Sequence, residues 1–380
     1  MRILHTADLH LGRQLNRYPL DEDQGAILDQ IVRAVVNFNV DVLIIAGDIF
    51  DRAAPPATAV RLFNAFLSQV ASETKAAVVM IAGNHDSGDR IASMSIMTDT
   101  RRALIRGVVC VDEKPFFLSD KHGVVAFSGL PFSHEYAARE CFADETLQTQ
   151  EDILAAQIAS ARYSIPDSVR WVIVAHAFVS GAHGSASERP LVQVGGVELV
   201  RPEIFDGADY VALGHLHRPQ SVGVPHIRYS GSPLTFGFDE ADVPKSMSLV
   251  DIDGGGNATV EEVLFKPIRG VRTIRGRHAE LLLARPSTDF IKAVLTDDTP
   301  VIDAMKRLRD VFPNTCELSY ERDERTHEIR SFDGISKKTA NPLDVVSEFV
   351  DAVTNEPMTG EELNVVASAL HDIRRGEDAA

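Results

Sequence analysis

The sequence predicts a four-layer α/β/β/α fold, in which two sheets pack face to face between outer helices. Three observations support this prediction. Short apolar runs bounded by glycine and polar residues recur along the chain and are typical of strands buried on both faces. Amphipathic helical patterns separate the early runs. Antiparallel hairpin patterns follow the last of them.

The elements of the N-terminal part follow from apolar spacing and from turn residues. Ile27, Ile31 and Val35 lie on one stripe of a helical pattern, and Pro55-Pro56 is a typical helix start. The predicted strands are residues 2–4, 42–46, 77–81, 108–111 and 124–130, and the predicted helices are 24–38, 56–70, 88–106 and 150–163.

The later elements fall into strands, a β-α-β unit and two terminal helices. Asn341-Pro342 is a cap signal, and Thr359 with Glu362 forms a capping box, so each of these pairs predicts a helix start. The other predicted elements are strands 171–174, 210–213, 227–230, 247–252, 258–265, 290–295 and 316–320 and helix 300–312. We therefore expect domains at residues 1–265 and 266–335, then a helical pair at 341–375.

Polar side chains with metal-binding chemistry follow five of the apolar runs. Because a buried sheet holds the residues at its strand ends rigidly, these side chains are expected to converge. Carboxylate, imidazole and amide donors suit Mn, Fe or Zn, and they exceed the needs of one tetrahedral ion. A two-metal centre with a bridging carboxylate and ions roughly 3.5–4 Å apart is therefore predicted. The candidates are Asp8, His10, Asp48, Asn84, His85, His176, His215 and His217.

Each candidate also has a structural interpretation on its own. A single histidine after a strand is commonly a structural residue, an aspartate after glycine is commonly a turn residue, and Asn84 would suit a positive φ. Five repetitions of the same arrangement favour a site over coincidence. The remaining histidines lack this context and are interpreted as loop surface: His122, His134, His183, His226 and His278.

The order of these motifs resembles that of the calcineurin-like metallophosphoesterases. The segment His5–Gly12 is similar to the opening of the SbcD-type DNA exonucleases, the nuclease subunits of SbcCD complexes. Ser187–Pro190 followed by Gly195-Gly196, and Tyr229–Pro233, resemble the same group. The resemblance has specific motifs to about residue 270 and weakens towards residue 325.

The resemblance implies a role for each candidate. One metal would be held by Asp8, His10, Asp48 and His217, and the other by Asp48, Asn84, His176 and His215, with Asp48 bridging. His85 matches the catalytic histidine of the family, and Asp86 beside it is expected to orient it. Some relatives have a second histidine where this chain has Asp51. Asp51 is then either an acceptor that orients a ligand histidine or a surface turn residue.

The resemblance also implies an activity and partners. The expected protein is a two-metal, manganese-dependent nuclease that degrades double-stranded DNA 3′–5′ and cuts hairpins and single strands endonucleolytically. It would act in DNA repair and recombination with an SbcC-type ABC ATPase, as a homodimer within a heterotetramer. The helix near residues 88–106 would form the dimer interface, residues 266–335 would position DNA, and the terminal helices would dock on the ATPase. Two alternatives remain: a phosphoesterase acting on small molecules or phosphoproteins, and a non-catalytic DNA-end-binding scaffold.

Composition limits the mode of DNA binding and the compartment. A formal net charge of −17 over 380 residues argues against coating DNA by bulk electrostatics. Locally, residues 266–278 are basic, which indicates either a DNA contact or a solvated edge strand. The three cysteines have no paired spacing, and neither a signal peptide nor a membrane span is evident, so a cytoplasmic, nucleoid-associated protein is expected. The candidate DNA contacts are Arg13, Arg17, Arg269, Arg272 and Arg275.

Overall fold

The computed structural model divides the chain into two compact units, Met1–Ser319 and Tyr320–Ala380. It describes residues 1–96, 99–188, 192–193, 196–197, 199–322, 358–360, 362–363 and 365–367. The first unit contains both large sheets, and each unit is described by itself.

The first six-stranded sheet has the order β16-β15-β1-β4-β5-β6. Its strands β1, β4, β5 and β6 are parallel, and the β15–β16 hairpin joins antiparallel at β1. The bounds are β1 Arg2–Thr6, β4 Val42–Ala46, β5 Ala77–Ile81, β6 Ala103–Arg106, β15 Ser246–Ile252 and β16 Ala258–Leu264.

The second six-stranded sheet has the order β13-β14-β12-β9-β8-β7. Its four central strands are parallel, and the edge strands β7 and β13 run antiparallel to their neighbours. The bounds are β7 Phe116–Asp120, β8 Gly123–Leu130, β9 Arg170–His176, β12 Tyr210–Gly214, β13 Gln220–Val222 and β14 Val224–Tyr229.

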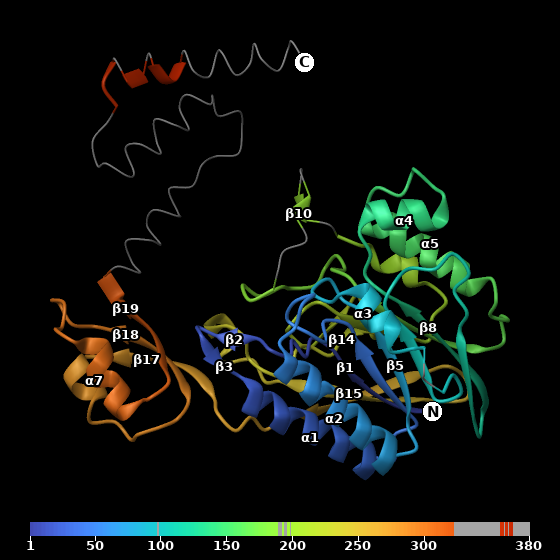
Figure 1. Ribbon diagram of the computed structural model, residues 1–380, viewed down its shortest axis with the longest axis horizontal. Coiled ribbons are helices and arrows are strands. Elements are labelled where there is room, and N and C mark those ends of the chain that lie inside the picture. The colour runs from blue at the N-terminus through green and yellow to red at the C-terminus, as the bar shows by residue number, and fades with distance from the viewer. Residues whose placement is uncertain are drawn as a thin grey trace. The chain divides into compact units, whose positions relative to one another are not determined.

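The two sheets pack face to face through one apolar layer. Ile44 and Val79 of the first sheet share this layer with Phe127 and Val174 of the second, and all four side chains are fully buried. Helices α1 (Asp21–Asn37) and α2 (Ala57–Glu73) cover the outer face of the first sheet, while α5 (Gln150–Arg162) covers that of the second with α4 (Glu135–Phe142) packed against it (Figure 1). The predicted four-layer α/β/β/α fold is therefore confirmed.

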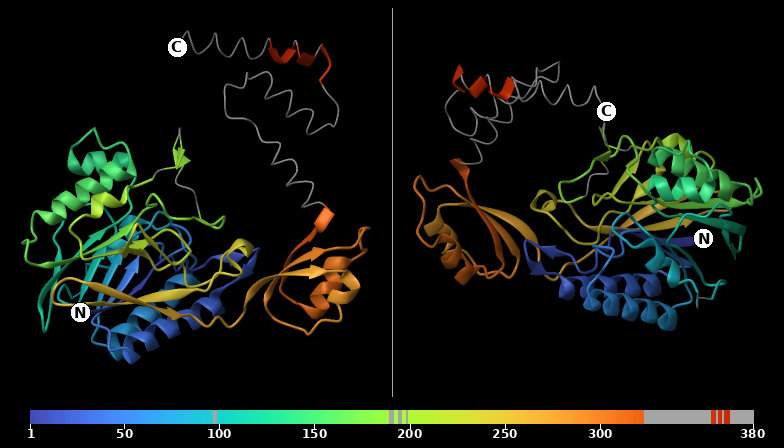
Figure 2. Two further views of the ribbon diagram at one scale, coloured as in Figure 1. Left: turned by 180° about the vertical axis from the view of Figure 1, so that it is seen from behind. Right: turned by 45° about the horizontal axis from the view of Figure 1, so that its top comes forward.

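A smaller three-stranded sheet follows, with the order β17-β18-β19. Helix α7 packs beside it (Figure 2), and Leu308 of that helix is fully buried. The predicted β-α-β unit is present, and the basic segment supplies the additional edge strand β17. The bounds are β17 Val271–Gly276, α6 His278–Leu281, β18 Phe290–Leu295, α7 Ala304–Val311 and β19 Thr315–Tyr320.

The remaining elements are short. They are β2 Gln14–Leu15, β3 Tyr18–Pro19, α3 Gly88–Ser93, β10 Val192–Gln193, β11 Gly196–Val197, and the 3₁₀ helices η1 Pro202–Phe205 and η2 Phe238–Glu240. Within the described residues, no helix combines the length and the apolar character that crossing a bilayer requires.

The long helix predicted for residues 88–106 is wrong. Helix α3 ends at Ser93, and Ala103–Arg106 forms edge strand β6, which pairs with β5. A turn in which the Arg102 and Ala103 amides donate to the Asp99 carbonyl oxygen starts this strand. Sequence periodicity could not detect the pairing, because its partner lies on another element. The strand predicted at residues 108–111 is also absent, and β7 and α4 were missed.

The predicted capping box at the last described helix is confirmed. The Thr359 hydroxyl lies 2.8 Å from Glu362 Oε2, and the Glu362 amide donates back to Thr359 Oγ1 at 3.4 Å. The helix start at Asn341-Pro342 and most of the terminal helical pair lie outside the described residues, as do Arg189, Pro190 and Gly195.

Candidate metal centre

All eight predicted ligand-type side chains lie at the carboxyl ends of five parallel strands, three from one sheet and two from the other. Each position follows or ends a strand that is buried over most or all of its length, which explains why an apolar run precedes it. Asp8 and His10 follow β1, Asp48 follows β4, Asn84 and His85 follow β5, His176 ends β9, and His215 and His217 follow β12.

The Asp48 carboxylate lies at the middle of this group. Its Oδ2 is 3.6 Å from His10 Nε2 and 3.8 Å from His85 Nε2. Its Oδ1 is 3.6 Å from His176 Nε2. The Asp48 carboxylate therefore faces imidazoles from three other strand ends. Two of these strands belong to the first sheet, and the third, which ends in His176, belongs to the second.

Four further contacts bring the remaining candidates together. Asn84 Oδ1 lies 3.0 Å from His176 Nε2 and 3.1 Å from His215 Nδ1. His10 Nε2 and His217 Nε2 are 3.1 Å apart. The Asp8 carboxylate accepts the backbone N–H of His215 at 2.9 Å. Donor atoms from both sheets thus point at a common space.

Burial sets the charge state of these groups. Burial raises the pKa of Asp8 well above its usual value, and the neighbouring Asp48 raises it further. Burial lowers the pKa of His176 to about 4, and it lowers the pKa of His10 and His215 well below the usual range. Neutral imidazoles present the lone pair that a metal requires, and two buried carboxylates favour a bound cation.

This donor set fits a pair of divalent ions. Asp8, Asp48 and His176 offer ligand atoms that all lie within 4.8 Å of one another. Oxygen and imidazole nitrogen donors without thiolate suit Mn, Fe or Zn. The residues that could hold the ions are those that converge here, with Asp48 located where a shared ligand would be needed.

The backbone at the site is strained. Asp8, His10, Asp48 and His215 have φ angles of 54°, 43°, 48° and 108°. Non-glycine residues rarely adopt positive φ, and such strain concentrates at functional sites that the surrounding fold over-determines. All four of these residues are candidate ligands at the common space.

Glycines allow the two sheets to meet closely behind this space. A Cβ on Gly214 would lie 1.9 Å from the Ala46 carbonyl oxygen, and one on Gly83 would lie 2.2 Å from Asp48 Oδ1. Neither atom belongs to a flexible side-chain tip, so a methyl group at either position requires the backbone or the carboxylate to move. Both glycines are needed for their small volume.

The partner of His85 differs from the one expected. Its Nδ1 lies 2.8 Å from the backbone oxygen of Asp51. The Asp86 carboxylate instead accepts backbone N–H groups of Ile49 at 3.1 Å, Phe50 at 2.9 Å and Gly83 at 3.0 Å. Asp86 therefore connects the loops after β4 and β5. The His85 ring contacts the backbone oxygen of Asp51, where a contact with Asp86 was expected.

The Asp51 carboxylate lies near two side chains at the rim. Its Oδ1 is 3.8 Å from His10 Nδ1 and 3.8 Å from an Arg13 nitrogen. His10 Nδ1 is a buried nitrogen with no hydrogen-bond partner among the described residues. This arrangement favours the interpretation of Asp51 as a residue that orients ligand histidines over that of a surface turn residue.

The candidate DNA-contacting arginines differ in their surroundings. Arg13 lines a pocket of about 440 Å³ together with Gln14, Asp51, Arg52 and His85, and it lies over the Phe236 ring. Arg17 is exposed in the turn between β2 and β3, and it does not line this pocket.

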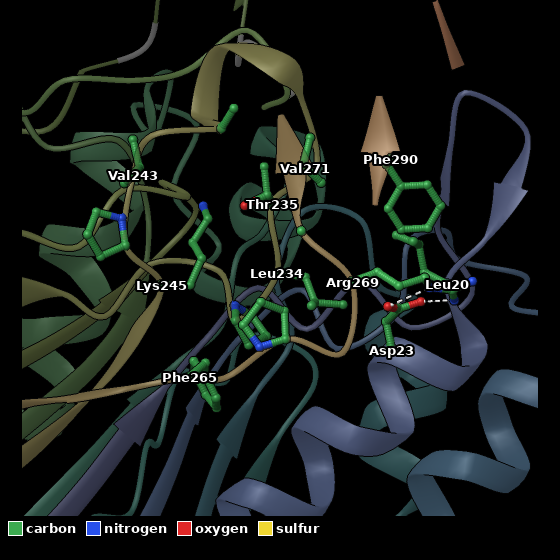
Figure 3. Close-up of a pocket in the computed structure, with 15 residues that line it drawn as sticks. Leu20, Asp23, Leu234, Thr235, Val243, Lys245, Phe265, Arg269, Val271 and Phe290 are labelled. Atoms are coloured by element: carbon green, nitrogen blue, oxygen red, sulfur yellow. Dashed lines mark hydrogen bonds and ion pairs between the residues drawn. The ribbon is translucent and has the colours of Figure 1, made fainter. Parts of the chain in front are cut away.

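The basic segment places its arginines away from this pocket. Arg269 forms an ion pair with Asp23 of α1 (Figure 3) and stacks on Phe290, so it joins α1 to the small sheet. Arg272 and Arg275 lie on edge strand β17, where Arg272 Nε is 2.8 Å from the Asp289 carboxylate. Both side chains are exposed.

Sequence reasoning missed the residues that surround His217. Glu240 and Lys245 are buried around it and Glu188 is half-buried beside it, yet none follows a strand in the pattern that identified the ligands. Ser187 and Glu188 had been noted only as part of a motif. A buried lysine near a buried glutamate has no sequence signature that separates it from an exposed pair.

Comparison with known proteins identifies two segments. Residues 1–219 match the family model of the calcineurin-like phosphoesterases. Residues 267–354 match the SbcD C-terminal domain model, described as the type 5 capsule protein repressor C-terminal domain. A solved structure titled "GAP50 the anchor in the inner membrane complex of Plasmodium" is similar at 11% identity and a TM-score of 0.43, covering 84% of this chain and 96% of that one. No functional inference is drawn from a likeness at that level.

Proposed function

The chain belongs to the calcineurin-like phosphoesterase family, and from this premise we propose that it is the DNA nuclease subunit of an SbcCD-type complex. The proposed activities are 3′–5′ exonuclease action on double-stranded ends and endonuclease action on hairpins and single strands, in DNA repair and recombination. The observation that supports this proposal is the convergence of both predicted ligand sets on Asp48, in a chain whose C-terminal part matches an SbcD domain.

The proposed division of the metal ligands is the one that the family resemblance implies. One ion would be held by Asp8, His10, Asp48 and His217, and the other by Asp48, Asn84, His176 and His215, with manganese as the expected metal. Divalent ions bound there would lower the pKa of a coordinated water and neutralise charge on the phosphoryl oxygens.

The proposed roles of the surrounding residues concern protons and orientation. His85 is the proposed catalytic histidine. A hydrogen on its Nδ1 is donated to the Asp51 carbonyl oxygen at 2.8 Å, which leaves Nε2 directed towards Asp48 Oδ2 at 3.8 Å. When the ring carries a second proton, on Nε2, that nitrogen can donate it to the departing oxygen of the phosphodiester, which leaves the neutral imidazole. Asp86 has a positioning role, because it fixes the loops that hold Asp48 and His85.

The proposed DNA contacts are local, as the acidic net charge requires. Arg13 beside the open pocket would contact the phosphate nearest the centre. Arg272 and Arg275 on the exposed edge strand would contact phosphates further along the substrate. Arg269 is less suited to this role, because its ion pair with Asp23 is partly buried and its guanidinium stacks on Phe290, whereas the ion pair of Arg272 with Asp289 is exposed. Arg17 remains a candidate DNA contact only because its side chain is exposed.

The proposed assembly follows the matched C-terminal domain. We propose a homodimer that joins an SbcC-type ABC ATPase in a heterotetramer, with residues 341–375 as the docking segment and the cytoplasm, at the nucleoid, as its location. The proposed domain division is 1–265 for catalysis and 266–335 for DNA positioning.

The test is cleavage by the purified protein with Mn²⁺. Linear double-stranded DNA labelled at either end and a DNA hairpin are compared with a small aryl phosphodiester. Shortening of the DNA from its 3′ ends together with hairpin cutting supports the proposal. Intact DNA with rapid hydrolysis of the small ester would instead favour a small-molecule phosphoesterase. Binding of DNA ends without hydrolysis of any substrate would favour a scaffold.

A further inference from the structure

His217 has a different kind of partner from His176 at the same centre. Its Nδ1 lies 3.1 Å from Glu240 Oε1 and 2.6 Å from Ser187 Oγ. The corresponding Nδ1 of His176 lies 2.9 Å from the carbonyl oxygen of Ala46. A carboxylate holds a hydrogen on Nδ1 and makes the other ring nitrogen a stronger ligand than a neutral carbonyl does.

Glu240 is fully buried, and hydrogen-bond donors surround its carboxylate. Oε1 accepts hydrogen bonds from Ser185 Oγ at 2.9 Å and from the Ser187 hydroxyl. Oε2 accepts from Lys245 Nζ at 2.6 Å and from the Phe236 amide at 3.3 Å. A buried carboxylate with this many donors has a fixed position, so the imidazole that it contacts is fixed as well.

Lys245 holds Glu240 and His217 at the same time. Its Nζ donates to the His217 carbonyl oxygen at 2.9 Å and to Ser232 Oγ at 3.0 Å, in addition to Glu240. The side chain also lines a pocket of about 210 Å³ together with Leu234 and Phe265 (Figure 3). The His217 amide donates to Glu188 Oε1 at 2.6 Å, so both the backbone and the ring of His217 are constrained.

The charges of this network are consistent with its geometry. Burial raises the pKa of Glu240, but the hydrogen bond from His217 and the charge of Lys245 outweigh burial and hold that pKa below its usual range. Lys245 Nζ lies 2.6 Å from Glu240 Oε2, so an ammonium there balances the charge of the buried carboxylate.

We propose that Glu240 and Lys245 are positioning residues that fix His217 with Nε2 directed into the centre. Through His217 they strengthen binding of one divalent ion, which makes the two metal subsites unequal in affinity. This inference deepens the proposed function and rests on its two-metal centre, but not on DNA as the substrate.

The test measures Mn²⁺ binding by calorimetry on metal-free protein, for the wild type, Glu240→Gln, His217→Ala and the double variant. Glu240→Gln is expected to raise the dissociation constant of one ion about 10–100-fold and to leave that of the other unchanged. His217→Ala should weaken the same binding step. Because Glu240 acts through His217, adding Glu240→Gln to His217→Ala should cause no further loss beyond about twofold.

Two controls separate positioning from folding. Glu113 is a buried glutamate paired with Arg106 away from the centre, so Glu113→Gln makes the same chemical change and should leave both constants unchanged. Glu240→Gln combined with Lys245→Met removes the buried charges together and avoids leaving one of them unpaired. This double variant should fold and should still bind one Mn²⁺ ion more weakly. It replaces the Glu240→Gln variant if that variant is unstable.

The outcomes distinguish this inference from the proposed function. Unchanged Mn²⁺ constants in folded Glu240→Gln, or losses that add fully to those of His217→Ala, overturn the positioning role and leave the nuclease proposal intact. A wild type that binds two ions but cleaves no DNA overturns the nuclease proposal, while a selective loss in Glu240→Gln would still support the positioning role. A wild type that binds no divalent ion overturns both.

Discussion

The backbone N–H of His85 donates a 2.9 Å hydrogen bond to Oδ1 of Asp48. The residue proposed for proton transfer is thereby attached to the carboxylate proposed to bridge the ions. A movement of the loop after β5 would therefore change the distance between His85 and Asp48. This contact fixes the backbone of His85 next to the candidate ligand Asp48.

His85→Gln should abolish DNA cleavage and leave metal binding near two ions per chain. The backbone hydrogen bond to Asp48 survives this substitution, whereas the titrating ring nitrogen is lost. General acid–base groups typically contribute about 10²–10⁴-fold to a rate. Single-turnover cleavage and elemental analysis measure the two effects separately. Loss of metal together with activity would show that His85 is a ligand.

Replacing Arg272 and Arg275 together with alanine should weaken DNA binding and reduce its dependence on salt. Each lost phosphate contact lowers the slope of log K against log salt by about 0.9 for duplex DNA. Fluorescence anisotropy over a salt series measures this slope. Arg33→Ala with Arg61→Ala removes the same charge from exposed positions on α1 and α2 and is the matched control. Equal slopes for both double variants would rule out a contact at β17.

Gly214→Ala should destabilise the protein by about 1–3 kcal/mol or more, because its Cβ would collide with the Ala46 carbonyl oxygen. The opposite effect on stability is expected for alanine in place of Gly25 in α1. A Cβ there meets only Leu62 at 3.7 Å, so Gly25→Ala should stabilise the protein by about 0.5–1 kcal/mol through helix propensity. Urea unfolding measures both changes. A Gly214→Ala variant as stable as the wild type would contradict the close approach of the two sheets.

His5 should make folding stability depend on pH. Burial lowers the pKa of His5 to about 3, although its ring lies 2.9 Å from the Tyr210 hydroxyl and 3.2 Å from the Leu213 carbonyl oxygen. The unfolded chain binds a proton at this residue near pH 6.5, whereas the folded chain does not, so stability falls as pH drops from about 6.5 towards 3. At pH 5 the loss is about 2 kcal/mol.

The comparison variant for this prediction is His5→Gln, which does not titrate. Its free energy of unfolding should fall less steeply between pH 7 and pH 5 than that of the wild type, by about the same 2 kcal/mol. Parallel curves for the two proteins would show that His5 is protonated in the folded state or is not buried.

Deleting residues 341–380 should remove binding of the ATPase partner and leave the catalytic unit folded. The centre and both large sheets lie within Met1–Ser319, so their contacts do not require the deleted segment. Co-purification with the ATPase and circular dichroism of the truncated chain measure the two properties. An unfolded truncated chain would indicate that the terminal segment serves stability instead of docking.

The sequence was sufficient to predict the strand ends of the centre, because parallel strands that are mostly buried leave largely apolar runs before the ligands. The prediction failed where the secondary structure or the role of a residue depends on contacts with other elements. Ala103–Arg106 was predicted as helix because only its pairing with β5 makes it a strand. Glu240 was missed because its role depends on Lys245 and His217, which come together only in the folded chain.

The divided origin of the centre has a consequence during synthesis. The donors of the first sheet, from Asp8 to His85, leave the ribosome early, but the imidazoles from His176 to His217 belong to strands made much later. A growing chain that has reached only β8 lacks the complete ion-binding set, however well its first half has folded. The complete set of candidate ligands is therefore available only once the later strands of the second sheet, β9 and β12, have been made.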